Sequence, residues 1–73
     1  MTTGSYSEER VELTPRMRDV LVSAADGRTV TQTARELGIS EGTVKSVRAA
    51  ALARLHAASM AHAIALALRR GEL

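Results

Sequence analysis

The sequence predicts an all-α fold of four short helices. Four stretches of the chain begin with a residue that can cap a helix, namely Thr14, Thr29, Ser40 and Ser59. Such a side chain accepts a hydrogen bond from a free backbone N–H of the first turn, so it marks a helix start. Apolar residues recur at helical spacing behind the caps. Glycine stands where three of the stretches end, at Gly27, Gly38 and Gly71. One small helical domain is therefore expected.

The first twelve residues are expected to form a flexible arm, and residues 13–73 the folded domain. Residues 1–12 are polar, show no helical period and hold three glutamates against one arginine. The arm is therefore acidic, whereas the rest of the chain is basic. Tyr6, the chain's one aromatic residue, is expected to be solvated or lightly docked.

The first expected helix follows residues 13–15. Leu13 precedes the cap, Thr14 is the cap, and Pro15 takes the first helical position, where no N–H partner is required. The buried stripe behind them consists of Met17, Val20, Leu21 and Ala24. These residues recur at helical spacing, so one face of the helix is expected to enter the core.

Residues 29–55 have the sequence form of a helix-turn-helix. Thr29 and Gln32 have the spacing of a capping box, in which each side chain satisfies a backbone N–H of the other residue. Gly38 can adopt the left-handed conformation that ends a helix, and Ile39 can enter the core beneath the corner. Ser40 then caps the next helix. Two short capped helices joined in this way are typical of the motif.

The third expected helix, residues 41–55, presents polar and basic side chains near its N-terminus. They are Thr43, Lys45, Ser46 and Arg48. A recognition helix presents these positions to base edges and phosphates in the major groove of DNA. Val44, Ala51 and Leu55 are expected to face inward, and Glu41 lies in the first turn, where the helix dipole favours an anion.

The fourth expected helix runs from the Ser59 cap to Gly71 and has two apolar faces. Met60, Ala63, Ile64 and Ala67 form one face, sufficient to dock on the other helices. Ala61, Ala65 and Leu68 lie to one side. Small residues at a spacing of four allow close helix approach, so the second face is a candidate two-fold dimer interface. The alternative is a single wide core stripe.

Six pieces of the sequence match one known family together. They are L-T-P-R at 13–16, V-L at 20–21, G at 27, A-x-x-L-G-I-S-E-G-T-V-K at 34–45, R-L at 54–55 and A-L-A-L-R-R-G at 65–71. From residue 13 to 73 the chain thus resembles the DNA-binding domain of LuxR-type (GerE-like) bacterial transcription regulators, here standing alone. S-E-G-T-V-K-S also resembles region four of bacterial sigma factors, which lacks the C-terminal A-L-A-L-R-R-G helix.

The resemblance implies a four-helix domain that binds DNA through residues 41–55. It places base-edge contacts at Lys45, Ser46 and Ala49, with Arg48 alongside. Phosphate contacts are expected at Arg16, Thr31, Ser40, Thr43 and Arg54. It also implies a dimer through the C-terminal helix. The alternative for Lys45 and Arg48 is a solvated helix face, and for Arg16 it is a surface ion pair.

Three of the residues that depart from the family pattern bear on the strength of DNA binding. Thr31 stands where a lysine is common, although its hydroxyl can still donate to a phosphate oxygen. Thr33 stands at a normally apolar site and is expected to loosen the packing. Ala49 stands where relatives often carry a longer polar side chain, so it offers only a methyl-sized contact. The changes at Thr31 and Thr33 point to weaker DNA binding per subunit, and Ala49 is expected to concentrate the readout on few bases.

The composition limits the kind of core, metal site and membrane segment that the chain can form. The chain has no Phe, Trp or Cys, so a thin, alanine-rich core is expected, without disulfides or thiolate metal sites. His56 and His62 have no ligand-like companions, and no metal or other cofactor is expected. No apolar run reaches membrane-spanning length, and a cytoplasmic protein is expected.

The leading functional hypothesis is a sequence-specific transcription regulator that binds double-stranded DNA as a homodimer. The alternative is an interaction module that binds a larger regulator or RNA polymerase, with weak DNA contact or none, including a role like that of sigma region four. An enzyme is not expected, because the sequence shows no carboxylate pair, activated nucleophile, phosphate-binding glycine loop or metal cluster.

Overall fold

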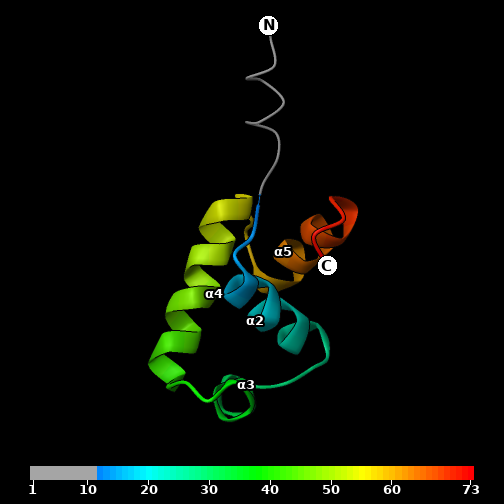
Figure 1. Ribbon diagram of the computed structural model, residues 1–73. Helices are drawn as coiled ribbons and strands as arrows, with labels where there is room; N and C mark the ends of the chain where they lie inside the picture. Colours follow the sequence, from blue (N-terminus) through cyan, green and yellow to red (C-terminus); the bar gives the residue numbers. More distant parts are fainter. Residues whose placement is uncertain (1–11) are drawn as a thin grey trace, which may run out of the picture.

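The computed structural model describes residues 12–73, which form four helices and no strand (Figure 1). The helices are α2 (Pro15–Ala25), α3 (Val30–Leu37), α4 (Glu41–Leu55) and α5 (Met60–Arg69). The all-α fold is therefore confirmed. The expected arm, except for Glu12, and the expectation for Tyr6 lie outside the described residues.

All four helices begin at the predicted caps. The cap side chains accept hydrogen bonds from backbone N–H groups in four pairs, Thr14 from Met17, Thr29 from Gln32, Ser40 from Thr43 and Ser59 from His62. The Thr29 capping box is complete, because Gln32 Oε1 accepts from the Thr29 N–H at 2.9 Å. These caps satisfy donors that would otherwise have no partner in the first turn.

Two apolar clusters hold the helices together, and α2 and α4 run through both. The first cluster joins α2, α4 and α5 and is built on Leu13, Met17, Leu21, Ala51, Leu55, Ala63 and Ala67. The second joins α2, α3 and α4 and is built on Val20, Ala34 and Val44. Figure 1 shows α2 in the middle, and it packs against all three other helices. The N-terminal half of α4 thus rests on the second cluster and its C-terminal half on the first.

A buried hydroxyl pair joins α2 to α3. Ser23 and Thr33 are both buried, and their hydroxyl oxygens lie 2.7 Å apart in a hydrogen bond. A buried hydroxyl without a partner costs about 1–3 kcal/mol, and the pairing avoids that cost for both residues. The expectation that Thr33 would loosen the packing is therefore wrong. The sequence predicted that Ala24 would be buried in α2. In the structure Ser23 is buried, and Ala24 is only half-buried.

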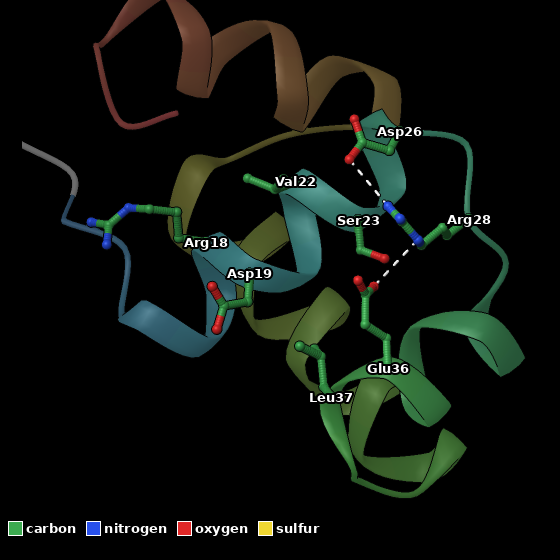
Figure 2. A pocket seen from close by; sticks show the side chains of 8 residues that line it. All are labelled: Arg18, Asp19, Val22, Ser23, Asp26, Arg28, Glu36 and Leu37. Carbon is green, nitrogen blue, oxygen red and sulfur yellow. Dashed lines mark hydrogen bonds and ion pairs between the residues drawn. The ribbon is translucent and has the colours of Figure 1, made fainter.

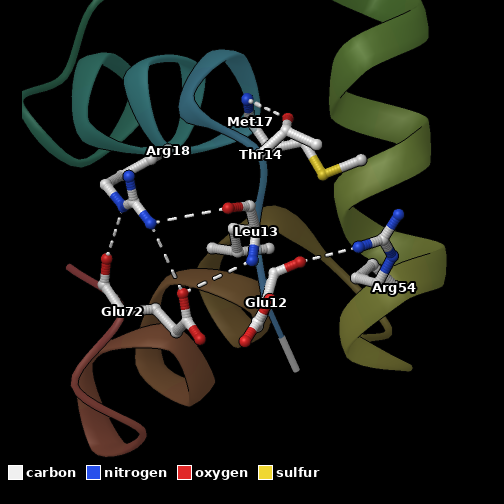
Figure 3. Close-up of polar contacts among 7 residues, drawn as sticks. All are labelled: Glu12, Leu13, Thr14, Met17, Arg18, Arg54 and Glu72. Carbon is white, nitrogen blue, oxygen red and sulfur yellow. Dashed lines mark hydrogen bonds and ion pairs between the residues drawn. The ribbon is translucent and has the colours of Figure 1, made fainter. Parts of the chain in front are cut away.

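The two ends of the described chain are tied together (Figure 3). The Glu72 carboxylate accepts from the Leu13 N–H at 3.4 Å, and Arg18 Nε donates to the Glu72 carbonyl at 3.0 Å. On the other side, Arg54 Nη1 donates to the Glu12 carbonyl at 2.6 Å. The start of the domain is thus held between the C-terminal residues and the last turn of α4.

Within residues 12–73, no single helix is long and apolar enough to cross a membrane. By length and composition α4 and α5 pass such a test only as a pair, and a bend of 54° separates them.

Candidate nucleic-acid interface

The corner between α3 and α4 sets the direction in which α4 projects. Gly38 ends α3 in the left-handed conformation, with φ +70°, which glycine adopts without the penalty of a side chain. The Ile39 N–H then bonds to the Ala34 carbonyl at 3.0 Å, and the half-buried Ile39 side chain packs against the second cluster. Ser40 starts α4 directly afterwards. The helix-turn-helix predicted from the sequence is present.

The outward face of α4 carries the residues expected to contact bases. Lys45, Ser46 and Ala49 are exposed, and Arg48 is half-buried. Within residues 12–73 no hydrogen bond or ion pair engages the side chains of Lys45, Ser46 or Arg48, so their donors are available to a ligand. Val44, Ala51 and Leu55 face the opposite way and are almost fully buried, as predicted.

The N-terminus of α4 carries two of the expected phosphate contacts. Ser40 and Thr43 are exposed, and the Ser40 Oγ accepts from the Thr43 N–H at 3.0 Å. It also donates to Thr43 Oγ1 at 2.9 Å. Glu41 and Gly42, the other residues at the start of the first turn, are exposed as well. A helix N-terminus with free donors favours an anionic group such as a phosphate.

Of the other three expected phosphate contacts, only Thr31 lies near the N-terminus of α4. Thr31 lies near it, but its hydroxyl donates to the Glu41 carboxylate at 2.9 Å. Arg54 lies in the last turn of α4, roughly 20 Å along the helix from Ser40, and is bonded to Glu12. Arg16 is exposed in the first turn of α2 and forms no ion pair within the described part of the chain. The structure therefore brings Thr31, Ser40 and Thr43 together with Lys45 and leaves the two arginines apart.

No local pattern in the sequence indicates the contact between Thr31 and Glu41. The two residues lie ten positions apart on different helices, with the turn at Gly38 between them in the chain. Glu41 was expected only to favour the helix dipole. Its carboxylate also accepts the hydrogen bond from Thr31 and so joins α3 to α4.

The residues expected to form a dimer lie on α5 at different depths. Leu68 is 58% exposed, and Ala61 is exposed as well. Ala65 is half-buried, so it is less accessible than the other two residues. On the opposite side of α5, Ala63 and Ala67 are fully buried, while Met60 and Ile64 pack partly buried against the first cluster. The docking face was thus predicted correctly, and the second face is open mainly at Leu68.

A separate open pocket lies between α2 and α3 (Figure 2). It measures about 310 Å³, and its apolar lining residues are Val22, which is 43% exposed, and Leu37. Arg28 bridges two carboxylates at its rim, with Nη1 at 3.1 Å from Asp26 and Nε at 3.3 Å from Glu36. The pocket contains none of the residues expected to contact DNA.

Comparison with known proteins identifies one family. Residues 11–67 match the model of GerE, described as bacterial regulatory proteins of the luxR family. The match covers all of α2, α3 and α4 and most of α5. A search among curated proteins finds no match to the chain.

Proposed function

The chain belongs to the luxR family of bacterial regulatory proteins, a family of DNA-binding helix-turn-helix domains, and we propose that it is a sequence-specific regulator. In this proposal it binds double-stranded DNA as a homodimer, and each protomer places α4 in the major groove.

The outward face of α4 is the observation that carries this proposal. Lys45 and Ser46 are exposed on the second turn, with donors that no residue of the described chain engages. Lysine donates to the O6 and N7 atoms of guanine, and serine pairs with several base edges. Ala49, one turn further, presents a methyl group of the size that contacts thymine. Base discrimination is therefore concentrated on few positions of the site.

Phosphate contacts would supply much of the affinity. Ser40, Thr43 and the first turn of α4 are proposed to hold one phosphate, because a helix N-terminus favours an anion. Arg48 and Arg16 add positive charge, and Arg54 contributes at the far end if its bond to Glu12 opens. Each phosphate that a cation neutralises releases counterions, so affinity falls as salt rises.

The direct test is selection of bound duplexes from a random pool, followed by titration of the selected site at several salt concentrations. We expect a short enriched motif, repeated at a spacing of about one helical turn. The logarithm of the binding constant should fall linearly with the logarithm of the salt concentration. Recovery of no enriched motif, with equal binding to every duplex, would refute sequence-specific regulation.

Leu68 is proposed as the centre of the dimer interface. Its side chain is more than half exposed although it is large and apolar, and Ala61 on the same side leaves room for close approach of a second helix. We expect Leu68→Glu to shift the protein to the monomer in analytical ultracentrifugation. Binding to a single half-site should be unchanged, and binding to the two-half-site duplex should weaken about 10-fold or more. Ala53→Glu on α4 is the matched control, since it also adds a charge at an exposed position.

The pocket beside Val22 supports a second candidate, a module that binds a larger regulator or RNA polymerase. Val22 is the other large apolar residue that the described chain leaves substantially exposed, and it lies away from the outward face of α4. Retention of a protein partner by a variant with Lys45 and Arg48 both replaced by Glu would favour this candidate.

A further inference from the structure

Two opposite charges stand one turn apart on the face of α4 that is proposed to contact DNA. Glu41 and Lys45 are both exposed, and they have the spacing of four residues that brings side chains together on a helix. The order, with glutamate N-terminal to lysine, is the more favourable one for an ion pair. By its sequence alone, α4 would be expected to pair these two side chains.

The structure shows a different partner for Glu41. Its Oε2 accepts a hydrogen bond from Thr31 Oγ1 on α3, at 2.9 Å. The ion pairs within residues 12–73 are Arg18 with Glu72, Arg28 with Asp26 and Arg28 with Glu36. Lys45 takes part in none of them. The carboxylate is thus directed toward α3, and the ammonium group has no partner within residues 12–73.

We propose that Thr31 is a positioning residue that holds Glu41 away from Lys45 and so keeps Lys45 available to DNA. This inference rests on the proposed function, because it names a residue that prepares the DNA-binding face of α4. It also gives Thr31 a role other than the phosphate contact expected from the sequence. The hydroxyl acts through the carboxylate it binds.

The two partners of Glu41 compete, and the outcome affects DNA binding. If Lys45 were paired with Glu41, that pair would have to break before Lys45 reached a base or a phosphate. A carboxylate beside Lys45 would also face the phosphate backbone and repel it. Pairs of this kind at exposed sites are weak, so the expected effect of losing Thr31 is a drop in affinity of about two- to fivefold at low salt.

Four variants isolate the effect. Thr31→Val removes the hydroxyl with little change in shape. It is expected to weaken duplex binding about two- to fivefold at low salt, as measured by fluorescence anisotropy. Thr31→Ser keeps a hydroxyl and is expected to restore binding. In Glu41→Gln, where no ion pair with Lys45 can form, adding Thr31→Val should have no further effect. A loss that persists in the Glu41→Gln background would show that Thr31 contacts phosphate directly, and would overturn the inference.

A second measurement needs no DNA. Lys45 is the chain's only lysine, so an amine-reactive acylating reagent followed by cleavage after arginine reports its modification in the peptide of residues 36–48. Pairing with a carboxylate disfavours the neutral, nucleophilic amine. We expect acylation of Lys45 to slow about twofold in Thr31→Val and to recover in Thr31→Val/Glu41→Gln. Equal rates in the wild type and Thr31→Val would overturn the inference. Failure of the wild-type protein to bind any duplex would instead refute the proposed function.

Discussion

Replacement of both Lys45 and Arg48 by Glu is expected to abolish specific DNA binding, with a loss of affinity of at least about 100-fold. Each side chain lies on the face of α4 that the corner at Gly38 directs outward, and neither has a partner within residues 12–73. A base contact of this kind is worth about 1–3 kcal/mol, and about 1.4 kcal/mol is a factor of ten. The new carboxylates would also repel the phosphates. Anisotropy with the selected duplex measures the loss.

A charge-matched control separates local contacts from net charge. Arg69→Glu/Arg70→Glu changes the net charge by the same amount, but Arg69 and Arg70 lie at the end of α5, remote from the N-terminus of α4 (Figure 1). We expect it to retain most of the affinity, with a small loss from the weaker overall field. Circular dichroism and sedimentation would verify that both variants fold and associate. Equal losses in the two variants would contradict a specific interface on α4.

Local signals explain why the helix boundaries could be predicted. A cap depends on residues three positions apart, such as Ser40 with the Thr43 N–H or Ser59 with the His62 N–H. The left-handed end at Gly38 depends on a single residue. Helical spacing likewise placed Val44 and Leu55 inward and Lys45 outward. These features are set within one or two turns, so the sequence was sufficient.

Contacts between distant residues were not predicted, because they depend on how the helices are placed. The bond from Arg54 to Glu12 spans 42 residues, and that from Leu13 to Glu72 spans 59. Thr33 shows the consequence most clearly. Taken alone, a hydroxyl at an apolar site suggested loose packing, but Ser23 on α2 supplies its partner. Ser23 had no recognisable role in the sequence until α2 and α3 were seen together.

The same limit applies to the candidate site. Sequence and resemblance indicated candidate contact residues on α4 itself, where the helical period decides which side chains face outward. They did not find that Glu41 bonds to Thr31, because that contact is made across the motif. Thr31 therefore has a partner on α4 that the sequence did not indicate, and Arg54 is bonded to Glu12 at the start of the domain.

The stability of the domain is expected to depend strongly on Leu55. Its side chain is 1% exposed at the end of α4, where the first cluster joins that helix to α2 and α5. Much of the cluster around it is alanine, including Ala51, Ala63 and Ala67. Such small side chains cannot extend into a vacated space. Leu55→Ala is therefore expected to lower the free energy of unfolding by about 2–5 kcal/mol, which chemical denaturation would measure.

The loss of stability in Leu55→Ala should occur without a change in the DNA-binding face of α4. Leu55→Met nearly conserves volume and is expected to cost less than about 1.5 kcal/mol, so it controls for the change of residue alone. Because Leu55 lies in the last turn of α4, far from Lys45, folded Leu55→Ala should bind the selected duplex with nearly wild-type affinity at low temperature. Excess duplex should then raise its melting temperature, since a ligand that binds only the folded state stabilises it. A small loss of stability in Leu55→Ala would instead mean that α4 is held mainly by the second cluster, around Val20, Ala34 and Val44.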